Sequence, residues 1–171
     1  MNNPFVAVLM GSDSDLATVQ HTLDILDRLG VTWQVKITSA HRTPSETRAF
    51  IATAEQQGCE VFIAAAGLAA HLAGTVAAHT LKPVIGIPMD GGPLNGHDAL
   101  LSTVQMPGGI PVACVAIGRA GARNAAYLAA QILALGNPEL AQRLAQERAS
   151  NAETVIEKDR ALAEQLNSTR T

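Results

Sequence analysis

Five short apolar and β-branched runs alternate along this chain with segments in which apolar residues recur at helical spacing. Most of these runs show no polar alternation, which is typical of strands buried on both faces of a sheet. The predicted strands are Phe5–Met10, Val31–Thr38, Val61–Ala65, Val84–Ile87 and Val112–Ile117. Parallel neighbours need crossover connections, which the intervening helices supply. The pattern therefore predicts an α/β fold, a three-layer αβα sandwich built on a five-stranded parallel sheet.

Capping residues mark the ends of several predicted helices. Gly30 is a natural C′ residue for the first helix, and Pro44 suits the first turn of the second. The stretches 88–97 and 106–111 are rich in Gly and Pro and are predicted loops. The predicted helices are Asp15–Leu29, Pro44–Gln57, His71–Leu81, a short helix capped by Asp98 that ends at Val104, and Ala120–Leu135.

The chain is long enough for one domain of this class and too short for a second. We predict a single α/β catalytic domain over residues 1–136, ended by Gly136-Asn-Pro138. Residues 137–171 carry a loose apolar stripe opposite charged residues and predict a long C-terminal helix. Such a helix exceeds the size of the domain, so we expect it to pack on a neighbouring subunit.

Composition excludes several classes of protein. With 47% hydrophobic and 16% charged residues the chain is neither disordered nor collagen-like. A net charge of −3, no basic block and 3% aromatic residues disfavour nucleic-acid binding. No segment approaches the roughly 20 apolar residues of a membrane span, and no basic leader precedes the first strand, which predicts a cytoplasmic protein. Cys59 and Cys114 are too few for a disulfide framework or a zinc site.

The loops that follow the strands should hold the functional site, because ligands of open parallel sheets bind beyond the carboxyl ends of the strands. Gly11-Ser12 places a hydroxyl at a helix N-terminus, where free N–H groups favour an anion such as phosphate. Simple capping by Ser12 or Ser14 is the structural alternative. Neither a Walker motif nor a Gly-x-Gly-x-x-Gly fingerprint is present, which disfavours nucleoside triphosphates and dinucleotides.

Asp13 and Asp15 lie in the same loop. Two carboxylates there suit a magnesium-dependent phosphatase, although acidic residues at a helix N-terminus also stabilise the helix dipole without a metal. Asp15 is in addition a candidate acceptor for sugar hydroxyls.

The second loop brings a hydroxyl, an imidazole and a guanidinium into one short turn. Arg42 offers a bidentate fork suited to phosphate, and His41 can carry a proton near neutral pH. The structural alternative pairs Arg42 with a helix acid and His41 with a carbonyl. In the third loop, backbone amides of residues 67–70 suit a carboxylate, and His71 follows them. No nucleophile motif is present, so noncovalent proton chemistry is favoured.

Taken in chain order, five stretches resemble the bacterial N5-carboxyaminoimidazole ribonucleotide mutase family of purine biosynthesis. They fall between about residues 5 and 135 and are Met10–Asp15, Ser39–Pro44, Ala69–Leu72, Ser102–Val112 and Asn124–Leu133. The resemblance implies a flavodoxin-like subunit, a homo-octamer with sites at subunit junctions, a small ribonucleotide as substrate, and neither a metal nor an organic cofactor.

The resemblance also implies roles for individual residues. His41 would be the catalytic residue that moves a proton while the carboxyl group passes from N5 to carbon 4 as trapped carbon dioxide. Two hydroxyls and the guanidinium would hold the phosphate, a carboxylate would hold the ribose, and the third loop would receive the aminoimidazole and its carboxylate. The implied substrate-binding residues are Ser12, Asp15, Ser39, Arg42, Gly67 and His71.

The third loop departs from the usual family pattern. Leu68 replaces a glycine and adds bulk beside the expected carboxylate cradle, and Ala73 replaces a proline. Direct carboxylation of aminoimidazole ribonucleotide is an alternative activity, but that class typically carries Lys after the histidine, where this chain has Arg42. A non-catalytic module that binds phosphate ligands or flavin mononucleotide is a second alternative, which the scarcity of aromatic residues disfavours.

Overall fold

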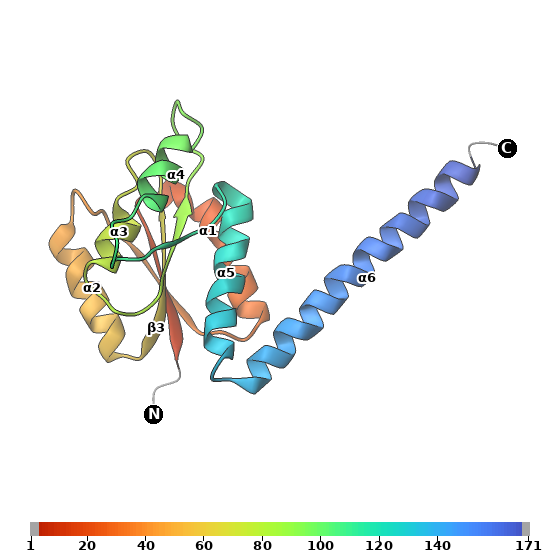
Figure 1. Ribbon diagram of the computed structural model, residues 1–171, viewed down its shortest axis with the longest axis horizontal. Helices are drawn as coiled ribbons and strands as arrows, with labels where there is room; N and C mark the ends of the chain where they lie inside the picture. The colour runs from red at the N-terminus through yellow and green to blue at the C-terminus, as the bar shows by residue number, and fades with distance from the viewer. Residues whose placement is uncertain (1–3, 169–171) are drawn as a thin grey trace.

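The computed structural model describes residues 4–168, and within them a single sheet of five parallel strands forms the centre of the domain (Figure 1). The order of the strands is β2-β1-β3-β4-β5, so the direction of winding reverses between β1 and β3. The strands are β1 (Phe5–Met10), β2 (Trp33–Ile37), β3 (Cys59–Ala66), β4 (Val84–Pro88) and β5 (Ala113–Cys114). This arrangement confirms the predicted flavodoxin-like αβα sandwich.

Helices cover both faces of the sheet and enclose two apolar cores (Figure 1). Successive residues of β1 point to opposite faces. Val8 belongs to the core under α1 (Leu16–Arg28) and α5 (Gly118–Ala134), and Leu9 belongs to the core under α2 (Pro44–Gln56) and α3 (Leu72–Ala77). The core side chains are mostly small and aliphatic, so helices and sheet approach closely.

The bounds of several elements differ from their predictions. Strand β5 spans two residues rather than Val112–Ile117, because it is an edge strand that pairs only with Ile85 and Gly86 of β4. Helix α3 ends at Ala77 rather than Leu81, because the His79 amide donates to the carbonyl of Val76 and the chain turns.

The helix starts also differ from the predictions. Helix α5 begins at Gly118, whose φ of +65° suits glycine, and not at Ala120. The predicted cap of the fourth helix is wrong: α4 (His97–Val104) has Gly96 at its N-cap position, and Asp98 lies in its first turn. The first predicted helix, Asp15–Leu29, is observed as α1, and a 3-10 turn, η1 (Asp13–Asp15), directly precedes it.

The long C-terminal helix α6 (Pro138–Ser168) is confirmed. Its first turns pack on the domain: Leu140 is buried, Nε of Arg143 donates to the Leu29 carbonyl at 2.8 Å, and Glu147 accepts from the Tyr127 hydroxyl at 2.6 Å. Beyond these contacts the helix projects away from the domain (Figure 1). In the part of the chain that the structure describes, no helix has both the length and the apolar character needed to cross a membrane.

Candidate active site

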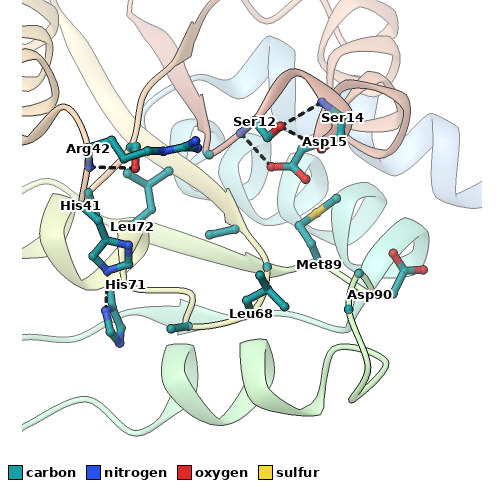
Figure 2. A pocket seen from close by; sticks show the side chains of 18 of the residues that line it. Ser12, Ser14, Asp15, His41, Arg42, Leu68, His71, Leu72, Met89 and Asp90 are labelled. Carbon is teal, nitrogen blue, oxygen red and sulfur yellow. Dashed lines mark hydrogen bonds between the residues drawn. The ribbon is translucent and has the colours of Figure 1, made fainter.

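A cavity of about 760 Å³ lies at the carboxyl ends of the strands, formed by the loops that follow β1, β2, β3 and β4. It includes the reversal point between β1 and β3, where ligands of this fold class bind. All seven residues singled out from the sequence line it: Ser12, Asp15, Ser39, His41, Arg42, Gly67 and His71. Five of them are labelled in Figure 2. The sheet therefore brings together three loops that are far apart in the sequence.

The first loop is held by a capping box. The hydroxyl of Ser12 accepts a hydrogen bond from the Ser14 amide at 3.3 Å, and the Asp15 carboxylate accepts one from the Ser12 amide at 3.1 Å. The capping alternative for Ser12 is therefore realised, and the same residue also lines the cavity. Burial raises the pKa of the Asp15 carboxyl, although hydrogen bonds from the backbone of Ser12 and Gly11 oppose this rise.

The second loop rests on hydroxyl groups that sequence reasoning did not single out. The Ser39 hydroxyl accepts from the Arg42 amide at 3.1 Å, and the Thr43 hydroxyl accepts from the Ser39 amide at 2.9 Å. Below them Thr38, which is buried, lies 3.1 Å from the Thr43 hydroxyl and 2.7 Å from that of Thr47, also buried. These bonds fix the backbone that presents the imidazole and the guanidinium.

The Arg42 side chain extends toward the Ser12 turn (Figure 2). Within residues 4–168 its guanidinium forms no ion pair and no hydrogen bond, so the suggested pairing with a helix acid is not found. Arg42 lines the cavity together with Ser12 and Ser39, and its guanidinium carries five N–H donors. This end of the cavity is therefore equipped to hold an anion.

The two histidines of the cavity contact each other directly. Nε2 of His41 lies 2.8 Å from Nδ1 of His71, and the rings meet edge to face at 83°. One of these nitrogens must donate and the other accept, so the two rings share a proton at this contact. Sequence reasoning placed both side chains in one cleft, but no signal in the sequence indicated their contact, which replaces the suggested bond of His41 to a carbonyl.

The third loop is tied to α4 and offers fewer free amides than expected. The Ala70 amide donates to the Ser102 hydroxyl at 2.9 Å, and the His71 amide donates to the Ala69 carbonyl at 2.9 Å. Neither amide is available for a carboxylate, so a cradle at this loop must use residues 67–69. Leu68 occupies the left-handed region with φ of +55° and lines the cavity.

The family is shown by comparison with known proteins. Residues 5–154 match the family model described as AIR carboxylase. This stretch holds the whole sheet and every residue of the cavity. The chain therefore belongs to the AIR carboxylase family, as the resemblance of its loops indicated.

Individual relatives cover almost the whole chain. N5-carboxyaminoimidazole ribonucleotide mutase of Bacillus subtilis is 51% identical over 154 residues, which are 90% of this chain and 95% of the relative. The protein of the same name from Escherichia coli K12 is 52% identical over 157 residues, 91% and 93% of the two chains. The crystal structure of Treponema denticola PurE superimposes with a TM-score of 0.84 at 31% identity, covering 94% of this chain and 99% of that one.

Proposed function

We propose that this chain is an isomerase that converts N5-carboxyaminoimidazole ribonucleotide to 4-carboxy-5-aminoimidazole ribonucleotide in purine biosynthesis, in the cytoplasm. Support comes from the family and from relatives of that name at 51% and 52% identity over about nine tenths of the chain. The single structural observation that carries the proposal is the meeting of an anion-binding end and an imidazole pair in one cavity.

The phosphate of the substrate binds at the end of the cavity formed by Ser12, Ser39 and Arg42. The guanidinium supplies a charged bidentate donor and the two hydroxyls supply neutral donors. Asp15, at the same end, accepts hydrogen bonds from the ribose hydroxyls. The base then extends toward Gly67 and the imidazole pair, across a cavity that these residues line together.

His41 moves the proton. In the reaction the N–C bond of the carbamate breaks, carbon dioxide leaves and the nitrogen gains a proton. Carbon 4 of the electron-rich ring then attacks carbon dioxide and loses its own proton. One proton is supplied and one is removed, so a single imidazole that first donates and then accepts balances the reaction. His71 orients this ring through the 2.8 Å contact.

Carbon dioxide must stay in the cavity between the two steps. The loop after β3 presents Ala and Gly residues, which allow a close fit around a small neutral molecule. A fitted cavity that excludes water keeps the two reacting carbons near each other and prevents hydration of carbon dioxide.

We also propose that the chain forms a homo-octamer in which α6 packs on a neighbouring subunit. The outer half of α6 carries exposed apolar residues, and a groove of about 820 Å³ opens between α5 and α6. Burial of apolar side chains of this kind against a second copy would stabilise the assembly. Light scattering on the full chain tests it, and a monomer at micromolar concentration would contradict it.

The activity is tested by supplying purified protein with N5-carboxyaminoimidazole ribonucleotide and following the appearance of the carbon-carboxylated isomer. Turnover above the spontaneous background is expected. A second reaction with aminoimidazole ribonucleotide and bicarbonate measures direct carboxylation. Efficient turnover of the second mixture alone would replace the proposed mutase activity by the carboxylase activity, and no turnover in either would overturn the proposal.

A further inference from the structure

Leu68 combines a strained backbone with a side chain in the cavity. Its φ of +55° lies in a region that leucine rarely adopts, and the residue is 54% exposed while it lines the cavity. Strained residues of this kind persist where the surrounding structure enforces them, and they gather at functional sites. Exposure of an apolar side chain to water does not stabilise the fold, so the position of Leu68 indicates a contact with the ligand.

The side chain of Leu68 spans two loops. A Cβ added to Gly92 would collide with Cδ2 of Leu68, so the leucine methyl lies against the bare Cα of that glycine. Gly92 itself has φ of +84°, and it belongs to the loop that follows β4. Leu68 thus connects the loop after β3 to the loop after β4, in the part of the cavity between His71 and Met89 (Figure 2).

The loop that carries Leu68 is anchored from outside the cavity. The Ala70 amide donates to Ser102 of α4, and the hydroxyl of Ser102 in turn donates to the Asp98 carbonyl at 2.7 Å. On the inner side, a Cβ added to Gly67 would lie 3.4 Å from Cβ of Met89, so the two loops are in close contact there too. These contacts hold the leucine in the part of the cavity between His71 and Met89 (Figure 2).

We propose that Leu68 determines the fate of the carbon dioxide released in the reaction, by packing against Gly92 and shielding that part of the cavity from water. This inference rests on the proposed function. After the N–C bond breaks, carbon dioxide is a neutral molecule with no covalent tether, and only packing retains it. Its two outcomes are a new bond to carbon 4 of the ring, or addition of water to give bicarbonate and a proton.

Leucine suits this role for a physical reason. Its side chain offers apolar surface to an apolar ligand and no hydrogen-bonding group to hold a water molecule. The groups proposed to hold the phosphate, Arg42 and Ser12, lie apart from Leu68 in the cavity (Figure 2), which His41, His71 and Asp90 also line. The Leu68 side chain would therefore affect how much carbon dioxide is captured by carbon 4 and how much escapes. It would have less effect on the binding of the ribonucleotide.

The test compares the wild-type chain with Leu68→Gly, which tolerates a positive φ and lacks the side chain. Each protein receives N5-carboxyaminoimidazole ribonucleotide in isotope-labelled bicarbonate, with an excess of carbonic anhydrase to equilibrate free carbon dioxide. Label in the product and the amount of aminoimidazole ribonucleotide formed are measured. We expect several-fold more label and more aminoimidazole ribonucleotide with Leu68→Gly, and a nearly unchanged KM.

Two further variants make the test specific. Leu68→Met keeps an apolar side chain of similar size and should retain the wild-type partition. Leu94→Ala removes an equally exposed leucine, at 57%, from the loop after β4 without touching the cavity, and should also behave as wild type. Melting curves of all variants show whether each is folded, and Leu68→Gly should be no less stable because glycine relieves the strain.

The outcomes separate this inference from the proposed function. If the wild-type chain forms no carbon-carboxylated product, the proposed function fails. If it forms the product and Leu68→Gly shows the same partition, or changes only KM, the role of Leu68 is overturned. Gly92→Ala adds an independent check. In the wild-type background it should increase the escape of carbon dioxide, because the added methyl group displaces Leu68. In the Leu68→Gly background it should cause little further escape.

Discussion

Nε2 of His41 and Nδ1 of His71 are 2.8 Å apart, although 30 residues separate the two histidines in the sequence. They come from the loops after β2 and β3, on either side of β1 in the sheet. The contact leaves the second nitrogen of each ring free to face other partners. This geometry is the basis of the first two predictions.

His41→Asn is expected to abolish the proton transfer while preserving the shape of the loop. Loss of a general acid–base group lowers kcat by about 10²- to 10⁴-fold. Binding of aminoimidazole ribonucleotide, measured by calorimetry, should change little because the phosphate contacts remain. His21→Asn, on α1 outside the cavity, is the matched control and should keep full activity. Substantial turnover by His41→Asn would refute the assignment.

His71→Leu is expected to lower kcat less than His41→Asn does. It removes one hydrogen bond that orients the His41 ring, and such a bond contributes about 0.5–1.5 kcal/mol, or roughly a two- to tenfold rate effect. His71→Gln, which can still donate or accept, should recover part of the loss. The measurement is kcat and KM for all three proteins, and equal kcat for His71→Leu and wild type would contradict an orienting role.

The threonines below the second loop give a prediction for stability. Thr38→Val removes this bond from the buried hydroxyl of Thr47, which keeps its bond to the Thr43 carbonyl at 3.1 Å, and should lower the free energy of unfolding by about 0.5–1.5 kcal/mol. Thr47→Val should have a similar cost. The double variant removes both polar groups together and should be closer to wild type than the sum of the single changes. Urea unfolding measures the three values, and strict additivity would show that the hydroxyls are not coupled.

Asp15 gives a prediction about pH. Burial raises the pKa of this carboxyl in the folded state above its unfolded value. Between these two values the folded chain binds more protons than the unfolded chain, so stability falls as pH rises through this window. Asp15→Asn has no ionisation and keeps an oxygen that accepts from the Ser12 amide.

Asp15→Asn should therefore gain stability relative to wild type as pH rises from about 3 to 7, while KM for the ribonucleotide increases because a charged acceptor is lost. Thermal melting across this range, with kinetics at neutral pH, checks both effects. If the stability advantage of Asp15→Asn over wild type stays constant or decreases as pH rises, burial does not destabilise the ionised Asp15 carboxylate.

Cys59 should be inert in the folded protein. It is buried, and burial raises the pKa of its thiol to about 11. Since the thiolate is the reactive form, Cys59 should be alkylated at neutral pH only when the protein unfolds. Burial also raises the pKa of Cys114, which is less buried and should react sooner. Mass spectrometry of native protein treated with iodoacetamide measures this order, and rapid labelling of Cys59 would indicate local opening.

The sheet and the general position of the site could be predicted from the sequence because both depend on local patterns. Apolar runs such as Phe5–Met10 must be buried, and helices between them make the strands parallel. The carboxyl ends of parallel strands share one edge, so the hydroxyls, guanidinium and imidazoles after those strands were expected to meet there. Errors fell on edges and ends, as at β5 and α3, where few contacts enforce regular structure.

The contacts inside the site were decided only by the tertiary structure. Which loops become neighbours depends on the order of strands in the sheet, and that order is absent from the alternation of strands and helices along the chain. The pairing of His41 with His71, the Thr38–Thr47 bond and the contact of Leu68 with Gly92 all follow from packing between segments brought together by folding. Local residue types set what each loop can do, and long-range packing sets the distances and backbone angles at which those groups meet.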